Sequence, residues 1–190
     1  MELSDILNLI SPVSPETVRE FLSHCKVRRY QKGDSIVTQG LLEKSLFLVK
    51  EGVFRVGRVI DDIEDTICFG QRGDCFMSFH SFYAGEGAQF SCIAMTEVEA
   101  YVIDCSELEV LLAGYPDISR WFYKALSEEL YLIEKRYVYF GAKDAATRFE
   151  VFIAARPDIV KNVPTKYIAQ YLKVRPETLY RIRARYLRKL

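Results

Sequence analysis

Residues 166–183 of this 190-residue chain read KYIAQYLKVRPETLYRIR, a run whose spacing predicts two short helices. We expect the first helix over 165–172, with Thr165 as its cap. Its apolar side is formed by Ile168, Ala169 and Leu172. Pro176 suits the first turn of a second helix, which continues to about residue 189 after a three-residue turn. Two helices joined this closely, the second of them basic, form a helix-turn-helix.

The second helix divides its side chains between two faces. Its expected inward side carries Leu179, Ile182 and Tyr186, and Val174 is expected to fill the angle of the turn. The opposite side carries Glu177, Arg181, Ala184, Arg185 and Arg188. Arginines that flank a single acid have the hydrogen-bonding groups that read base edges in the major groove of DNA.

The DNA-binding candidates fall into two groups. Arg181 can bond guanine through two hydrogen bonds, Glu177 can accept one from the cytosine amine, and the methyl group of Thr178 can contact thymine. The candidates for phosphate contacts are Lys166, Arg175, Arg185 and Arg188, and Thr165 completes the DNA-binding set. Contacts of the first group would give specificity, and those of the second would give affinity without reading sequence.

The charge of the chain is unevenly distributed, although the net charge is zero. Residues 164–190 contain eight basic residues and one acid, Glu177, and so carry +7. The other 163 residues hold 18 basic and 25 acidic residues and carry −7. A basic end on an acidic body is typical of a protein whose end binds a polyanion. The alternative is a charged, solvated terminal helix.

The first 114 residues have the pattern of a β-sandwich or jelly roll that follows a small helix. Ser14-Pro15-Glu16 predicts a helix through about Ser23. Short apolar and β-branched stretches separated by glycine-containing turns then follow at 25–30, 35–38, 45–50, 53–59, 65–69, 90–95 and 98–104. Regularly spaced short strands of this kind indicate an all-β domain.

At residues 116–140, which contain no glycine, the spacing of the apolar residues changes to the three and four that are typical of a helix. One apolar stripe consists of Phe122, Leu126, Leu130, Ile133, Tyr137 and Phe140, and a second of Ile118, Trp121, Ala125 and Leu132. We expect one stripe to pack on the β-domain and the other on the same helix of a second chain, which makes a homodimer. The alternative is a long helix buried within a monomer.

Composition excludes several classes of protein. The chain is 49% hydrophobic and 27% charged, as in globular proteins, and its unbroken apolar runs are too short to span a membrane. The acidic start lacks the features of a signal peptide. Five scattered cysteines without a Cys-x-x-Cys pair argue against a disulfide framework and a zinc ribbon. We therefore expect a reduced, cytoplasmic protein.

The run KYIAQYLKVRPETLYRIR resembles the DNA-reading segment of the Crp–Fnr transcription regulators, whose Glu-Thr-x-x-Arg core matches Glu177, Thr178 and Arg181. YQKGDSIVTQG from Tyr30 and LFLVKEGVFRV from Leu46 are similar to the opening strands of the family's cyclic-nucleotide-binding jelly roll. The resemblance implies an α+β chain with a jelly-roll sensor domain (1–114), a dimerisation helix (115–140) and a helix-turn-helix domain (141–190). It also implies a near-palindromic DNA site as a partner, with RNA polymerase as a further one.

The chain departs from that family at the expected effector site. The family binds the ribose with Gly-Glu and the cyclic phosphate with an arginine, whereas this chain has Met77-Ser78 and Phe90 at those places. A buried phosphate without a cation is strongly unfavourable, so we expect no response to cyclic AMP and predict no cofactor. The candidate pocket comprises Phe76, Met77, Ser78, Phe79, Phe90 and Ser91. It either holds an apolar effector of unknown identity or is filled by its own side chains.

Two further departures concern the DNA-binding end. Lys173 stands where the family's turn usually has glycine, which predicts local strain. The sequence stops at Leu190, so we expect most of the wing hairpin to be missing.

Other chemistries find little support. The chain has two histidines, His24 and His80, too few for the metal sites of jelly-roll enzymes, and no nucleophile or phosphate-loop motif, so we predict no enzyme and no metal site. Haem ligation by Cys75 and His80, and redox sensing by an exposed thiol, remain open. The main functional alternative is an interaction module whose basic helix binds an acidic protein or a membrane surface.

Overall fold

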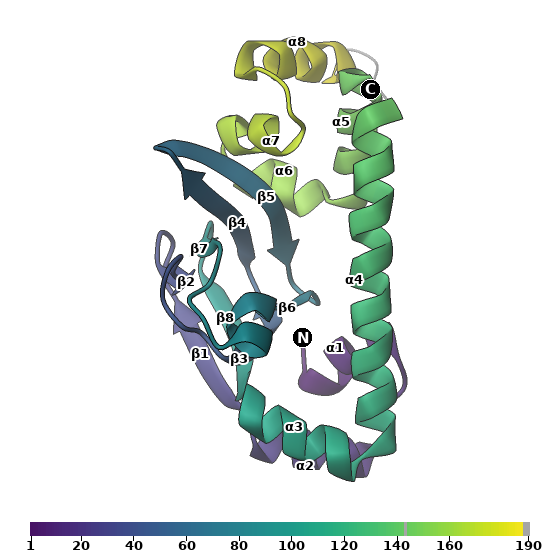
Figure 1. Cartoon of the computed structure of the whole chain (residues 1–190). Helices are drawn as coiled ribbons and strands as arrows, with labels where there is room; N and C mark the ends of the chain where they lie inside the picture. Colours follow the sequence, from purple (N-terminus) through teal and green to yellow (C-terminus); the bar gives the residue numbers. More distant parts are fainter. Residues whose placement is uncertain (143, 188–190) are drawn as a thin grey trace.

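A computed structural model describes residues 1–142 and 144–187 of the chain. Its centre is a sandwich of two antiparallel four-stranded sheets, which confirms the predicted jelly-roll-like domain (Figure 1). One sheet has the order β1(Lys26–Tyr30), β8(Val98–Asp104), β3(Ser45–Glu51), β6(Cys75–Met77). The other has the order β2(Ser35–Val37), β7(Ser91–Ala94), β4(Val53–Ile60), β5(Ile63–Gln71). The predicted strands are all present, and the short strand β6 is an addition.

The two sheets enclose a core of aliphatic and aromatic side chains. The ring of Phe76 lies between Phe47, whose centroid is 4.8 Å away, and Phe54, at 4.4 Å. Strand β3 is buried from Ser45 to Val49, because one of its faces contacts the opposite sheet and the other contacts helices. Apolar burial on both faces explains why this strand shows no alternation in its sequence.

Four helices cover the outer face of the sheet that contains β3. They are α1(Leu3–Ile10), α2(Pro15–Ser23), α3(Cys105–Gly114) and α4(Pro116–Ala142), and α2 begins at the predicted cap, Ser14, whose hydroxyl accepts from the Thr17 amide. Trp121 of α4 is fully buried, donates from Nε1 to the Leu7 carbonyl at 3.0 Å and meets Phe21 edge to face. These contacts attach the start of α4 to the sandwich.

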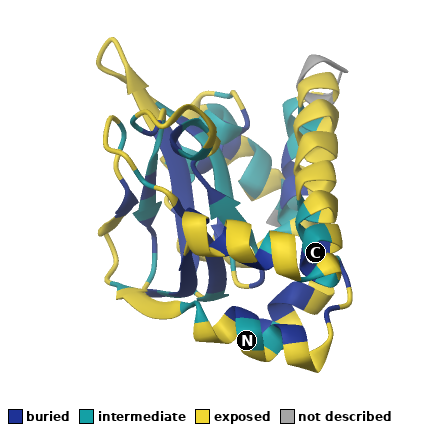
Figure 2. Cartoon of the chain, turned by 60° about the horizontal axis from the view of Figure 1, so that its bottom comes forward, coloured by how far each residue is buried: buried dark blue, intermediate teal, exposed yellow. Residues whose placement is uncertain are grey.

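Helix α4 then runs along the length of the sandwich to the C-terminal helices (Figure 1). These are α5(Ala145–Ala155), α6(Pro157–Asn162), α7(Thr165–Tyr171) and α8(Pro176–Leu187). Their apolar sides form a separate core, which also includes Val53 and Met95 of the sandwich. The side of α4 that faces away from the rest of the chain is exposed over most of its length (Figure 2).

The β4–β5 hairpin projects beyond the sandwich toward α6 and α7 (Figure 1). Its two-residue tip consists of Asp61 and Asp62, with φ values of 49° and 60°. Both residues therefore take the left-handed conformation of a tight hairpin turn, which aspartate tolerates better than most residues. The hairpin brings β5, the edge strand of its sheet, into contact with α6 and α7.

Candidate nucleic-acid interface

The predicted helix-turn-helix is formed by α7, the turn at residues 172–175 and α8. Leu179 is buried, and Ile182 and Tyr186 are half-buried on the same core. The Tyr186 ring meets Phe149 of α5 edge to face with centroids 6.0 Å apart. Val174 is half-buried in the turn, and its amide donates to the Ala169 carbonyl at 3.0 Å. The inward side of α8 is therefore held as the sequence predicts.

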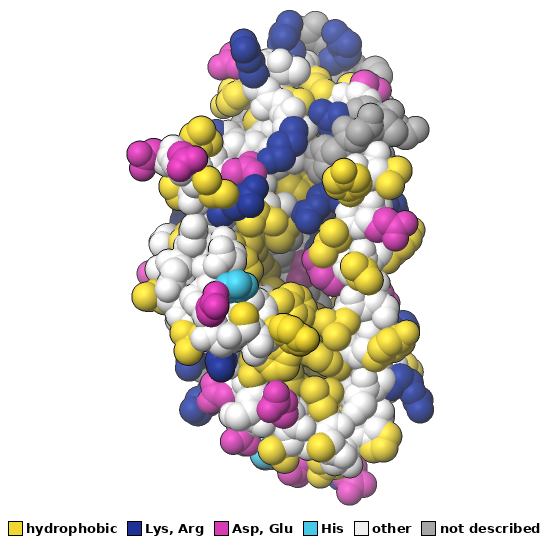
Figure 3. All heavy atoms as spheres, in the orientation of Figure 1, with side chains coloured by type: hydrophobic (Ala, Val, Ile, Leu, Met, Phe, Trp, Pro, Cys, Tyr) yellow, Lys and Arg dark blue, Asp and Glu magenta, His cyan; other side chains and the backbone are white. Residues whose placement is uncertain are grey.

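The outward side of α8 is open to solvent. Glu177, Arg181 and Arg185 are exposed, and Thr178 is half-buried, with its Oγ1 accepting from Arg181 Nη2 at 3.4 Å. Arg175 and Lys166 are also exposed. Figure 3 shows Lys and Arg side chains gathered at this end of the molecule. The structure thus brings the base-reading and phosphate-binding candidates onto one end, with Arg188 outside the described residues.

The prediction that Thr165 caps the first helix is wrong. Pro164 occupies the N-cap position, no side chain caps the helix, and Thr165 is the first helical residue. The ring of Pro164 fixes the backbone angle φ of the residue before the helix. The helix therefore begins at Thr165, one residue earlier than a cap at Thr165 would allow. Thr165 lies half-buried at the start of α7 and stays a candidate for DNA contact.

Lys173 confirms the expected strain in the turn. Its φ is 54°, in the left-handed region that favours glycine. Its Nζ lies 2.6 Å and 2.8 Å from the two carboxylate oxygens of Asp65 on β5. The residue that departs from the usual turn therefore links α7 to the β4–β5 hairpin.

The six candidate effector-pocket residues point in different directions. Met77 and Ser78 are buried where β6 ends, before a single π-helical turn, η1(His80–Ala84), and the Ser78 hydroxyl bonds Ser81. Phe76 lies in the stacked core, Phe79 is exposed, and Phe90 and Ser91 are half-buried. The Phe54 ring presses so closely on Gly70 that a Cβ there would lie 2.0 Å from it. Phenyl rings of the chain itself thus fill much of this interior.

An apolar groove lies nearby, between η1 and α4, and was not predicted. It has a volume of about 620 Å³ and is lined by Phe79, His80, Phe82, Tyr83, Ala84, Phe122 and Leu126. Figure 3 shows hydrophobic side chains gathered in this hollow between the sandwich and α4. The sequence signal that could have found it was the run of aromatics at 79–83, next to the apolar stripe of α4.

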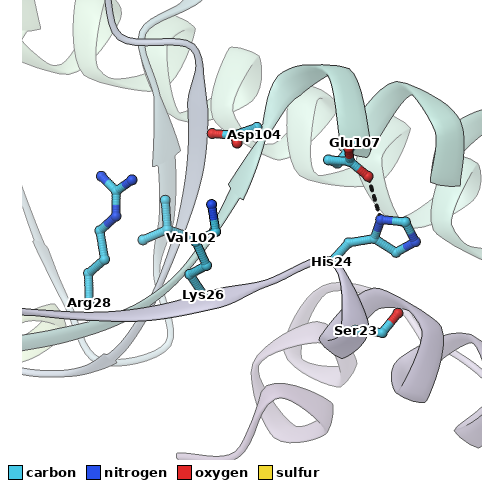
Figure 4. Close-up of a pocket in the computed structure, with 7 residues that line it drawn as sticks. All are labelled: Ser23, His24, Lys26, Arg28, Val102, Asp104 and Glu107. Atoms are coloured by element: carbon cyan, nitrogen blue, oxygen red, sulfur yellow. Dashed lines mark hydrogen bonds and ion pairs between the residues drawn. The ribbon is translucent and has the colours of Figure 1, made fainter.

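A smaller pocket of about 210 Å³ lies where β1 meets α3 (Figure 4). His24 at its edge bonds Glu107 through Nδ1, and Glu20 lies 3.4 Å from Nε2. The Glu107 carboxylate, with a smaller contribution from Glu20, raises the pKa of His24. His80 pairs with Glu86 at 3.0 Å. Among the described residues no group of three His, Cys, Asp or Glu side chains could hold a metal ion.

The five cysteines are poorly suited to redox sensing through a thiolate. Burial raises the pKa of Cys25 and Cys75 to about 12 and that of Cys68 and Cys105 to about 11, and it raises the pKa of Cys92 as well. All five are unpaired, and each is half-buried or buried. Because the thiolate is the reactive form, these thiols are weak nucleophiles at neutral pH.

We expect iodoacetamide to alkylate the native cysteines at pH 7.5 at least about 100-fold more slowly than the same residues in urea, where their pKa values return to about 8.5. Mass spectrometry of peptides at timed intervals measures each rate. A single cysteine that reacts as fast in the native protein as in urea would restore redox sensing as an alternative for that residue.

Comparison with known proteins identifies the fold. Residues 27–115 match the family model described as the cyclic nucleotide-binding domain. FixK2 from Bradyrhizobium japonicum is 18% identical with a TM-score of 0.75, over 87% of this chain and 85% of that one. A CooA mutant from Carboxydothermus hydrogenoformans is 21% identical with a TM-score of 0.72, over 100% of this chain and 85% of that one. The catabolite activator protein of Thermus thermophilus is 20% identical with a TM-score of 0.61, over 95% of this chain and 87% of that one.

These three structures share the fold of this chain over nearly its whole length, as the resemblance found in the sequence predicts. No curated protein sequence matches the chain at a significant level. Within the described residues, no helix is both long and apolar enough to cross a membrane.

Proposed function

We propose that this chain, which has a cyclic nucleotide-binding-type domain and the overall fold of the Crp–Fnr regulators, is a dimeric transcription regulator that binds specific DNA sequences and does not respond to cyclic AMP. It acts in the cytoplasm and performs no catalysis. Residues 1–114 form the sensor domain or scaffold, 115–140 the dimerisation helix and 141–190 the DNA-binding domain.

The observation that carries the proposal is the division of α8 between a buried and an exposed side. Glu177, Arg181 and Arg185 face solvent, while Leu179 holds the helix on its own core. Arginine and glutamate on the accessible side supply the donors and the acceptor that distinguish base pairs in the major groove. Phosphate contacts from Lys166 and Arg175 would flank them.

The competing function, a basic helix that binds a membrane or an acidic protein, fits this surface less well. A membrane-binding helix exposes a broad apolar side. Among the described residues of α8, Tyr180 is the one large hydrophobic side chain that is exposed. An acidic protein partner would not require Glu177 between the arginines, since that carboxylate would repel it.

Helix α4 supports the dimer. Ile118 and Trp121 of the second predicted stripe are buried within the chain, although its Leu132 is exposed. In the first stripe Phe122 packs partly on the core of the chain, whereas Leu126, Leu130, Ile133 and Tyr137 are exposed. Together with Tyr123, the exposed residues alternate spacings of three and four, the pattern of a coiled-coil seam. A second copy of α4 along this seam would reach the groove beside η1, which Phe122 and Leu126 also line. Within the part of the chain that the structure describes, these side chains stay exposed.

The lack of response to cyclic AMP rests on the contents of the jelly roll. Ser78 is buried and bonded to Ser81, Phe90 replaces the expected arginine, and the Phe47–Phe76–Phe54 stack occupies the space between the sheets. A cyclic phosphate in this interior would have to displace phenyl rings and remain without the arginine. An effector, if one exists, is therefore apolar.

The test is a selection of genomic DNA fragments by the purified protein near physiological salt, without added ligand. We expect enrichment of an inverted repeat whose half-sites lie about one helical turn apart. The Glu177→Ala, Arg181→Ala double variant should enrich no such repeat, since it lacks two of the proposed base contacts. Both side chains are exposed, so their removal should leave the fold intact. Absence of any enriched sequence with the wild-type protein would overturn the proposal of ligand-independent sequence-specific binding.

A further inference from the structure

The helix-turn-helix is attached to the β4–β5 hairpin by side chains from both partners. Lys173 Nζ contacts both carboxylate oxygens of Asp65, at 2.6 Å and 2.8 Å. Thr66 Oγ1 donates to Gln170 Oε1 at 2.7 Å, and Gln170 Nε2 donates to the Glu64 carbonyl at 3.2 Å. Three consecutive residues of β5 thus bind two residues of α7 and its turn.

Arg55 of β4 supports this contact from beneath. It is 6% exposed, and its guanidinium donates to Thr66 Oγ1 at 3.2 Å and pairs with the Glu64 carboxylate. Its Cζ lies 4.0 Å from the centre of the Tyr167 ring of α7, in cation–π geometry. Because Thr66 accepts from Arg55 and donates to Gln170, the side chains form a continuous chain of hydrogen bonds from the sheet to α7.

The same strand also binds α4. Arg136 Nη1 donates to the Ile67 carbonyl at 2.7 Å, one residue beyond Thr66. Two residues further on, the Phe69 ring packs on two aromatic rings of the C-terminal helices. The ring centroids are 6.0 Å apart for Phe152 of α5 and 5.6 Å apart for Tyr171 of α7. Strand β5 therefore fixes the position of the DNA-binding helices relative to the helix that carries the exposed seam.

The backbone of Lys173 is strained at the point where this contact forms. A lysine at φ 54° is less favourable than the glycine that the turn would otherwise accommodate. Glycine would relieve the strain, but it could not reach Asp65. The strained backbone of Lys173, together with the contact of its side chain with Asp65, therefore points to a function for this residue.

We propose that Lys173, Gln170, Arg55 and Asp65 form a latch that holds α8 in the orientation that reads DNA, so that no effector is needed to place it. The inference rests on the proposed function and adds how the reading helix is positioned. In a dimer the two α8 helices must lie about one DNA turn apart to enter successive major grooves. A helix-turn-helix free to rotate on the sandwich would lose specific contacts while retaining its charge for non-specific binding.

The experiment uses charge reversal in the full chain. Asp65→Lys places a second cation beside Lys173 and opens the latch, Lys173→Asp opens it from the other side, and the double reversal closes it again. Glu109→Lys is the matched control, since Glu109 is an exposed acid on α3, far from the DNA-binding helices (Figure 1). Lys173→Gly removes the side chain and relieves the turn, which separates loss of the latch from damage to the fold.

The first readout needs no DNA. Hydrogen–deuterium exchange of the β5 and α7 amides should become faster in Asp65→Lys, Lys173→Asp and Lys173→Gly, and return to wild-type rates in the double reversal. Unchanged exchange in all three single variants would overturn the latch, whatever DNA the protein binds. Failure of the proposed function would appear only in the DNA selection, so the two outcomes are distinguishable.

The second readout is binding to the selected repeat and to random DNA. Asp65→Lys should weaken binding to the repeat about tenfold while binding to random DNA stays equal or tightens, because the variant adds positive charge. Glu109→Lys should leave the ratio of the two affinities unchanged, and the double reversal should restore it to within about threefold. If Asp65→Lys binds both DNAs more tightly, the added positive charge alone explains its effect on DNA binding. That result would overturn the proposal that the Lys173–Asp65 contact orients α8.

Discussion

Arg181→Ala is expected to lower affinity for the selected repeat by about 30-fold to 10⁴-fold, since each of two half-sites loses a base contact worth about 1–3 kcal/mol. Arg181 is exposed, and its only described hydrogen bond is a 3.4 Å contact with Thr178. Truncation therefore removes no buried surface, and the free energy of unfolding should stay within about 0.5 kcal/mol of the wild type. Fluorescence titration of the repeat and of variants with one altered base pair measures the effect.

Arg185→Ala is the matched control, because it removes the same exposed group from the same helix, one turn further on. We expect this variant to weaken binding to all sequences alike and to reduce the salt dependence of binding, since a phosphate contact carries no sequence information. The discrimination between the repeat and its variants should not change. If both variants lower discrimination equally, the division into base-reading and phosphate-binding residues is wrong.

The sequence predicts the helix-turn-helix well because its signals are local. Val174, Leu179 and Pro176 lie within a few residues of one another, and their positions define a turn, a buried face and a helix start. The strands of the sandwich are predictable for the same reason, through short apolar stretches between turns. The predicted cap at Thr165 is wrong because Pro164 takes the N-cap position, which makes Thr165 the first residue of the helix.

Two helices beside the sandwich were missed for different reasons. Helix α1 has a readable signal, since Leu3, Ile6 and Leu7 recur at helical spacing before Pro12, and all three are buried. Helix α3 begins directly after β8 and has no side-chain cap. It is stabilised instead by burial of Leu108 and Leu111 on the core, which is a tertiary effect that propensity does not contain.

The latch could not be predicted from sequence. Lys173 and Asp65 are 108 residues apart, and Gln170 and Thr66 are 104 apart, so no local pattern joins them. The departure at Lys173 was visible as a non-glycine residue in a turn that favours glycine. Its consequence, a carboxylate partner on another domain, required the position of the β4–β5 hairpin.

Leu130→Asp is expected to convert the dimer to monomers and to abolish specific DNA binding at concentrations that saturate the wild type. Leu130 is 67% exposed in the single chain, near the middle of the seam. Two-fold symmetry brings each residue of a parallel seam close to its own copy. Two leucines that lose about 1.5–3 kcal/mol of burial each would raise the dissociation constant of the dimer by roughly 10²- to 10⁴-fold, before any repulsion between the aspartates.

Sedimentation velocity over a range of protein concentrations measures the change, with thermal unfolding to verify that the monomer is folded. The matched control is Leu132→Asp, which makes the same substitution two residues away at a side chain of similar exposure, 49%, on another side of α4. It should leave the dimer intact, because residues two apart on a helix do not share a face. Monomers from Leu132→Asp together with dimers from Leu130→Asp would place the interface on the second stripe, and monomeric wild-type protein would exclude the dimer. Since a monomer presents one reading helix, its affinity for the repeat should fall to that of a single half-site even though Arg181 is intact.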